Sequence, residues 1–193
     1  MAPRKSKHLL SLLARLQPFT AADPTRLSLC YVCVEETRAW ATDGHRALIL
    51  RRRDGDDGLA EGCYLDGGRA AAPGPTMPQI DAVIPPAETP VRFTLGAPLI
   101  RDLRELVAAL RPKVQATVRF GKTGTVLLIG DRKFAVVLDP TPSSKIVVNA
   151  RYLIDALDAL SSSGSLDVKF GDPCGPIRMD WIGNTAIVMP LCA

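Results

Sequence analysis

The sequence predicts an α+β fold made of three repeats of one unit, an amphipathic helix followed by three short strands. Three observations lead to this prediction. Leucine-rich segments with helical spacing occur three times along the chain. Each is followed by three short apolar runs that Gly, Asp, Asn or Pro turn residues separate. In two of the repeats a further apolar run precedes the helix, so the general unit is (β)αβββ.

The first repeat occupies residues 1–53. A helix is predicted from Ser6 to Leu16, and strands are predicted at Leu27–Val34, Arg38–Ala41 and Ala47–Arg51. Asp43-Gly44 lies between the last two strands and is a strong hairpin signal, because glycine supplies the positive φ that such turns need.

The second and third repeats together occupy residues 89–193. In the second, a strand at Val91–Leu95 precedes a helix from Pro98 to Leu110, and strands follow at 115–120, 125–129 and 133–138. In the third, a strand at Lys145–Val148 precedes Asn149, a residue type that caps helices, and a helix to Leu160. Its three strands are expected at 166–170, 177–181 and 185–189.

Residues 54–88 form an acidic stretch rich in Pro and Gly, which predicts a linker. The formal charge is +6 over residues 1–53, −6 over 54–88 and +4 over 89–193, which gives the net +4 of the chain. Two basic regions separated by an acidic one indicate moderate affinity for nucleic acid, weaker than a protein that reads base sequence would show.

Composition indicates a globular protein of the cytoplasm. Apolar residues make up 47% of the 193, and no apolar run approaches the ~20 residues that span a bilayer. Cys30-x-x-Cys33 invites a metal or redox interpretation. Both cysteines lie in one apolar segment without a second such pair, so free thiols are favoured and neither a metal nor a cofactor is predicted.

Enzymatic chemistry is not favoured. The chain has only two histidines, His8 and His45, and neither has a cysteine and an orienting carboxylate evident from the sequence, although Asp43 is near His45. Gly121-Lys122-Thr123-Gly124 lacks the spacing of a phosphate-binding loop. The sequence therefore predicts a binding protein rather than an enzyme.

Two distant motifs resemble one family. The hairpin Ala41-Thr42-Asp43-Gly44-His45-Arg46-Ala47-Leu48 and the tail Ile187-Val188-Met189-Pro190-Leu191 resemble the bacterial replicative sliding clamp, the beta subunit of DNA polymerase III. The helix at 149–157 and the linker segment at 77–85 are similar to further parts of that family. The resemblance implies half of the second clamp domain plus the whole third domain, with antiparallel sheets outside and helices inside.

The resemblance also implies a cleft that binds short peptide motifs of polymerases and other replication proteins. Carried over position by position, its residues are Leu29, Thr42, His45, Ala47, Pro78, Val83, Ile187, Val188 and Met189. Ala47 departs from the family, which has leucine there. For Thr42 and His45 a role in the turn alone, and for residues 187–189 a place in a core strand, are the alternatives.

A ring around duplex DNA needs positive charge toward the phosphates and no base contacts. The DNA-facing candidates on the first two helices are Lys5, Lys7, Arg15, Arg101, Arg104 and Arg111. The alternative is that they are ordinary charged residues of solvated helix faces. If the ring needs twelve units, three per chain imply a homotetramer with isologous interfaces. An open half-ring and a smaller ring are the alternatives. The expected partners are duplex DNA, a DNA polymerase and a clamp loader. The alternative is a clamp-like adaptor or decoy that binds the peptides without encircling DNA.

Overall fold

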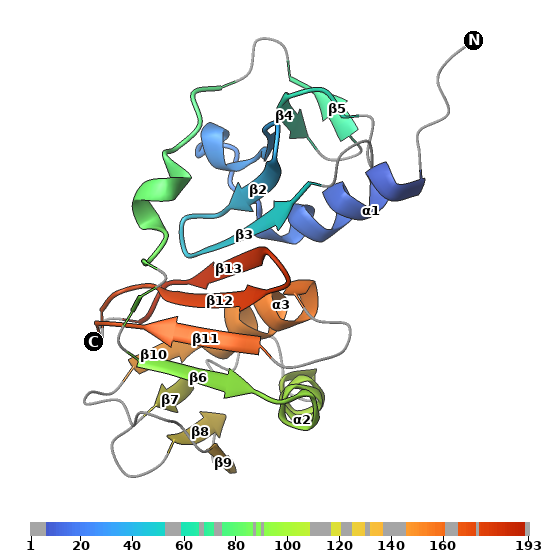
Figure 1. Ribbon diagram of the computed structural model, residues 1–193. Helices are drawn as coiled ribbons and strands as arrows, with labels where there is room; N and C mark the ends of the chain where they lie inside the picture. Colours follow the sequence, from blue (N-terminus) through green and yellow to red (C-terminus); the bar gives the residue numbers. More distant parts are fainter. Residues whose placement is uncertain are drawn as a thin grey trace. The chain divides into compact units, whose positions relative to one another are not determined.

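A computed structural model describes residues 7–52, 59–65, 68–71, 75–86, 88–89, 91–108, 117–120, 125–129, 132–136, 146–160, 166–172 and 174–191. The chain divides into two compact units, residues 1–80 with 183–185 and residues 81–182 with 186–193 (Figure 1). The two are called unit 1 and unit 2 below. Within the described ranges, no helix has both the length and the apolar character needed to cross a bilayer.

Unit 1 begins with helix α1, Lys7–Leu16, which runs directly into a short 3-10 helix, Gln17–Phe19. Leu13, Leu16 and Phe19 are buried, and Phe19 lies beneath strands β2 and β3 through contacts of its 3-10 turn. The predicted first helix is therefore confirmed. Leu13 and Leu16 are on the buried face of this helix, as expected for an amphipathic helix.

The sheet of unit 1 is antiparallel throughout, in the order β5-β4-β1-β2-β3. Its strands are β1 Val32–Val34, β2 Arg38–Thr42, β3 Arg46–Arg51, β4 Gly62–Leu65 and β5 Arg69–Ala70. Trp40 and Leu48 are almost fully buried in it. The hairpin of β2 and β3 pairs Thr42 with Ala47, as the Asp-Gly turn predicts.

One predicted strand is partly wrong. Leu27–Val34 was expected to be a single strand, but Leu27–Leu29 forms a 3-10 helix and only Val32–Val34 is extended. Leu27 is 60% exposed, so the first part of this apolar run does not enter the core. Periodicity cannot distinguish the two conformations in such a short run. Leu29 therefore lies on a helical turn rather than on the first strand.

Strands β4 and β5 lie within the segment predicted to be a linker. β4 pairs with β1 antiparallel, with Cys33 opposite Cys63. It thereby hydrogen-bonds the first strand after the helix, and β5 extends the sheet beyond it. The sequence did not predict these strands, because Gly62 and the surrounding polar residues weaken the strand pattern.

Unit 2 contains the two complete repeats in the predicted order. The first comprises β6 Val91–Leu95, α2 Ala97–Ala108, β7 Thr117–Phe120, β8 Thr125–Ile129 and β9 Arg132–Val136. The second comprises β10 Ile146–Asn149, α3 Ala150–Leu160, β11 Leu166–Phe170, β12 Ile177–Trp181 and β13 Asn184–Val188, of which residues 186–188 belong to unit 2. Asn149 Oδ1 accepts a hydrogen bond from the backbone N–H of Arg151, which confirms the predicted cap.

The opening strands of the two repeats are exchanged. β6 of the first repeat pairs antiparallel with β11 of the second, and β10 of the second pairs antiparallel with β7 of the first. Each sheet therefore contains one strand from the other repeat. This exchange explains why two repeats are needed for one domain.

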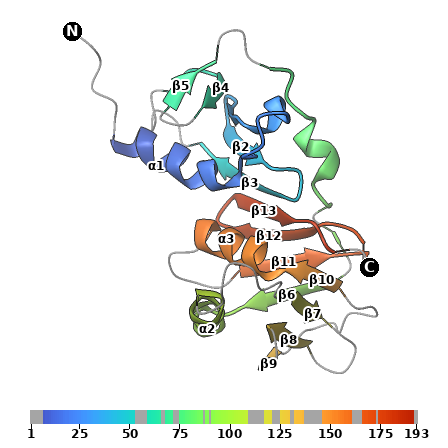
Figure 2. The same cartoon turned by 180° about the vertical axis from the view of Figure 1, so that it is seen from behind.

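Helices α2 and α3 lie side by side, and α3 packs against β10 and β12 (Figure 2). The inward face of α3 carries Leu153, Leu157 and Leu160, which are at most 3% exposed. They meet an equally buried sheet face that includes Val168 and Met179. The core of unit 2 thus lies between the helix layer and the β12-β11-β6 strands.

Candidate functional site

The β2–β3 turn is held by the side chains of its own motif. Thr42 Oγ1 donates to the carbonyl of Arg46 at 2.8 Å and accepts from the N–H of Gly44 at 3.0 Å. Asp43 Oδ1 accepts from the N–H groups of His45 and Arg46, at 2.8 and 3.0 Å. Thr42 and Asp43 therefore satisfy backbone groups that a tight turn leaves unpaired.

Arg46 ties this turn to the helical side of unit 1. Its Nε lies 3.0 Å from Asp43 Oδ2, and the side chains of Arg46 and Asp43 are 12% and 14% exposed. Its Nη2 donates to the carbonyl of Pro18 at 2.7 Å, and its guanidinium stacks 5.1 Å from the ring centroid of Phe19. A largely buried arginine with three separate partners orients the hairpin firmly.

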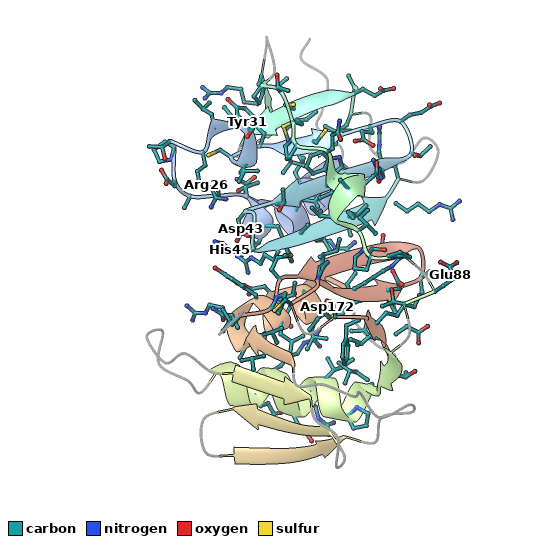
Figure 3. The ribbon with its side chains drawn as sticks, turned by 90° about the vertical axis from the view of Figure 1, so that its left-hand side faces the viewer. Arg26, Tyr31, Asp43, His45, Glu88 and Asp172 are labelled. Carbon is teal, nitrogen blue, oxygen red and sulfur yellow. The ribbon has the colours of Figure 1, made fainter. Side chains whose placement is uncertain are left out.

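Gly44 is required at the tip of the hairpin. Its φ is +87°, and a Cβ placed there would collide with the guanidinium of Arg26. Leu29 Cδ1 would lie 3.6 Å from that Cβ, so Leu29 borders the hairpin tip. Figure 3 shows Arg26, Asp43 and His45 together at this tip, with His45 exposed to solvent.

The remaining candidates of unit 1 differ in accessibility. Ala47 is only 3% exposed, whereas Pro78 is exposed in the segment that leads out of the unit. Leu29, Thr42, His45, Ala47 and Pro78 all belong to unit 1, and the other four candidates belong to unit 2. Unit 1 thus presents Leu29 and His45 beside one rigid turn, with Thr42 acting inside it.

Unit 2 contains a pocket of about 580 Å³ that is lined mainly by apolar groups. We call it the Met189 pocket. One wall is the segment 82–89, and another is the turn between β11 and β12. Its lining residues are Ala82, Val83, Ile84, Pro85, Pro86, Glu88, Thr89, Gly171, Asp172, Gly175, Pro176 and Met189. A concave apolar surface of this volume accommodates one or two large apolar side chains.

Two of the four unit 2 candidates line this pocket and two do not. Val83 is 47% exposed and Met189 is partly exposed, and both face the cavity. Ile187 and Val188 are at most 2% exposed and belong to the core of the last strand. For Ile187 and Val188 the core-strand alternative therefore fits the burial better.

The pocket wall is anchored by a network of charged groups. Arg178 Nη1 donates to the carbonyl of Pro85 at 2.9 Å, and its Nε contacts both oxygens of Asp180 at 2.9 Å. Lys169 Nζ donates to Asp180 Oδ2 at 2.8 Å, and its side chain is only 10% exposed. The arginine thus links the backbone at Pro85 to β12.

Sequence reasoning missed ten of the pocket residues: Ala82, Ile84, Pro85, Pro86, Glu88, Thr89, Gly171, Asp172, Gly175 and Pro176. Residues 84–89 and 171–176 are far apart in the sequence, and no periodicity links them. The one available signal was local. Asp172 begins a turn, in which its Oδ1 accepts from the N–H of Cys174 at 2.7 Å, and turn residues at strand ends often form binding surfaces.

The exposed helix surfaces of unit 2 are not basic over the described residues. Along α2 and α3, Arg101, Arg104 and Arg151 are offset by Asp102, Glu105, Asp155 and Asp158. Arg104 joins the helices, since its Nε lies 2.5 Å from Asp158 Oδ1 and its Nη2 donates to the carbonyl of Leu157. Arg101 is 70% exposed and 3.7 Å from Asp102.

The other DNA-facing candidates lie on or near α1 and α2. Arg15 is exposed near the end of α1, Lys7 begins that helix, and α1 carries no acidic residue. Lys5 and Arg111 lie outside the described residues. Of the six candidates, Arg15 and Arg101 are exposed residues, and Arg104 is engaged between the helices.

The cysteines do not form a metal site among the residues that the structure describes. Cys30 Sγ donates to the carbonyl of Asp23 at 3.3 Å, while Cys33 faces Cys63 across β1 and β4. Burial raises the pKa of Cys33 to about 12, and the neighbouring Cys63 and Glu35 contribute in the same direction. Such a thiol stays protonated at neutral pH.

No protein-family description matches this sequence. No curated protein sequence matches it either. Solved structures do match. The beta sliding clamp of C. crescentus, with polyethylene glycol bound to its proposed beta-motif tethering region, is 19% identical over 100% of this chain with a TM-score of 0.72. The beta subunit of DNA polymerase III from Thermotoga maritima is 16% identical over 98% of this chain with a TM-score of 0.73.

A third similar structure is the sliding clamp of Bartonella birtlesii bound to griselimycin, which is 17% identical over 97% of this chain with a TM-score of 0.69. This chain spans 67%, 64% and 64% of the three clamps, respectively. These matches are consistent with two features of the fold, the exchanged βαβββ repeats and the hairpin at Thr42–Arg46. The chain therefore has the fold of part of the bacterial DNA polymerase III beta subunit, the replicative sliding clamp.

Proposed function

We propose that this chain is a minimal sliding clamp, which encircles duplex DNA as a homo-oligomer and tethers replication proteins through short peptides. The partners are a DNA polymerase and a clamp loader in the cytoplasm. The observation that carries the peptide-binding part is the Met189 pocket, because Val83 and Met189, two residues expected from the family resemblance, line one apolar cavity. Small-molecule ligands bound to two similar clamps support a ligand-binding surface on this fold.

The chemistry of the pocket suits an apolar peptide anchor. Met189 is flexible and polarisable, so it adapts to leucine, methionine or phenylalanine side chains. Arg178 holds the opposite wall through the carbonyl of Pro85, which leaves the cavity formed before a ligand arrives. In unit 1, Leu29, His45 and Pro78 are proposed as contacts for partner peptides in their own right.

Peptide binding can be tested with a labelled, end-capped hexapeptide that contains a leucine-phenylalanine anchor. Met189→Ala removes most of a side chain that lines the pocket, so the affinity should fall by about fivefold, as for a contact residue in an interface. Leu191→Ala is the matched control, because Leu191 is 44% exposed in the same segment but does not line the pocket. Equal affinity of the Met189→Ala and wild-type proteins would contradict the assignment.

A second candidate is an adaptor that binds such peptides without encircling DNA. It is favoured by the charges of α2 and α3, where three arginines meet four carboxylates over the described residues. A DNA channel needs net positive charge toward the phosphates. Retention on a nicked circular plasmid that is lost when the plasmid is linearised supports the clamp. Retention on neither form supports the adaptor.

A further inference from the structure

We propose that the Met189 pocket selects peptides in which a lysine or arginine flanks the apolar anchor. This proposal rests on the proposed function for the binding of the anchor itself. The new element is a preference for a positively charged peptide, because two carboxylates, Glu88 and Asp172, are among the lining residues. The described residues that line the cavity include no lysine or arginine.

Both carboxylates are available to a ligand. Glu88 is exposed and makes no hydrogen bond or ion pair with any described residue. Asp172 is also exposed and uses Oδ1 for the N–H of Cys174, while its Oδ2 accepts no hydrogen bond from the described residues. Figure 3 labels both residues, one preceding β6 and the other in the β11–β12 turn.

The nearest described cations on β11 and β12 are already engaged. Lys169 and Arg178 share Asp180, and Arg178 uses a further donor for the carbonyl of Pro85. Neither is among the lining residues, whereas both carboxylates are. An ammonium or guanidinium group beside the anchor therefore meets opposite charge, and a carboxylate there meets like charge.

The effect should be modest and sensitive to salt. Ion pairs at exposed positions change affinity by about threefold each. A lysine peptide should thus bind about tenfold more tightly than a glutamate peptide at low salt, with a glutamine peptide between them. At 1 M salt, where the screening length is about 3 Å, the ratio should fall below about twofold.

The experiment uses the full chain and three labelled hexapeptides that share a leucine-phenylalanine anchor and carry Lys, Gln or Glu next to it. One set places this residue before the anchor and a second set places it after. Glu88→Gln should reduce the ratio of the affinities for the Lys and Glu peptides to about threefold. Glu88→Gln combined with Asp172→Asn should bring this ratio near one. The asparagine side chain retains an Oδ1 acceptor for the turn, and a urea midpoint checks the fold of each variant.

Glu61→Gln is the matched control, because Glu61 is an exposed carboxylate in unit 1 and should leave the ratio unchanged. If all three peptides bind equally to the wild type, the charge preference is overturned while the anchor pocket stands. If the preference persists in the double variant, its source is elsewhere and the proposal is also overturned. If no peptide binds at any salt concentration, the proposed function fails together with it.

Discussion

Single residues at the hairpin tip of unit 1 have structural roles that the motif alone does not reveal. Thr42, Asp43 and Arg46 direct their polar atoms back to the turn or to Pro18, and only His45 of the motif's polar side chains is exposed. The polar motif thus mainly holds one exposed histidine and the nearby Leu29 in a fixed position. The turn therefore positions the surface that His45 and Leu29 form, while most of its own polar side chains are not exposed.

Gly44→Ala should destabilise the protein by about 1–2 kcal/mol, because a residue with a Cβ is strained at a φ of +87°. The Arg26 guanidinium that the new Cβ would meet is the end of a flexible side chain and can move aside. Urea denaturation measures the loss. Arg26→Ala does not change the φ strain, so the double variant should remain destabilised by about the sum of the two single effects. No loss in the single variant would show that the turn adopts another conformation.

Ile182 has a β-branched side chain but a backbone conformation that such side chains disfavour. It lies in the β12–β13 turn with φ of +45° and is 72% exposed, a combination that β-branched residues avoid. Ile182→Asn should stabilise the protein by about 0.5–1 kcal/mol, since Asn accepts this conformation. The measurement is the urea midpoint at unchanged m-value. Ile182→Val keeps the branched Cβ and should give no such gain.

At the scale of elements, strands bounded by clear turns were predicted from the sequence to the residue, and those set by tertiary pairing were not. β6, β8, β11 and β12 match their predicted bounds, because turn residues such as Gly183 or Gly124 interrupt an apolar run at both ends. β4 was missed because its extended conformation depends on pairing with β1 and not on a strand pattern in its own sequence. Leu27–Leu29 was misassigned because a short apolar run carries no period of its own.

The candidate site followed the same division. Val83 and Met189 were predicted from the family resemblance, and the pocket contains both. Glu88 and Asp172 were not predicted, because only the folded sheet of unit 2 brings the segment before β6 to the β11–β12 turn. The chemistry that distinguishes this pocket therefore comes from contacts between distant residues rather than from a motif.

Cys33 on β1, opposite Cys63 on β4, should make the free energy of unfolding decrease at alkaline pH. The pKa of Cys33 is raised to about 12 in the folded chain, mainly by burial, against an ordinary value near 9 in the unfolded chain. Its contribution is complete below pH 9 and is lost as the pH rises from 9 toward 12, because the unfolded chain releases the proton first. Urea midpoints between about pH 8 and pH 10.5 should fall less steeply for Cys33→Val than for the wild type.

Thiol reactivity provides an independent check of the same pair. At about pH 8 an alkylating reagent should modify exposed Cys174 much faster than Cys33, since only thiolates react. Mass spectrometry of peptides after timed labelling measures the two rates. Equal rates would mean that β4 does not cover β1 in solution.

At the scale of the whole molecule, the proposed ring predicts a definite mass. Three repeats per chain require four chains for twelve units, which is about 83 kDa for a chain of 20.7 kDa. Light scattering coupled to size-exclusion chromatography should give this value at micromolar concentration. A stable mass near 20.7 kDa would exclude the ring and leave the adaptor as the remaining candidate.

The exchange of β6 and β10 affects how unit 2 folds during its synthesis on the ribosome. Neither half can complete its own hydrogen-bonded ladder, so the earlier-made half must wait, with an unpaired strand edge, until the later one leaves the ribosome. Such non-local pairing slows folding and exposes edges to other chains in the meantime. Two separately produced fragments, cut between β9 and β10, should for the same reason assemble only with each other.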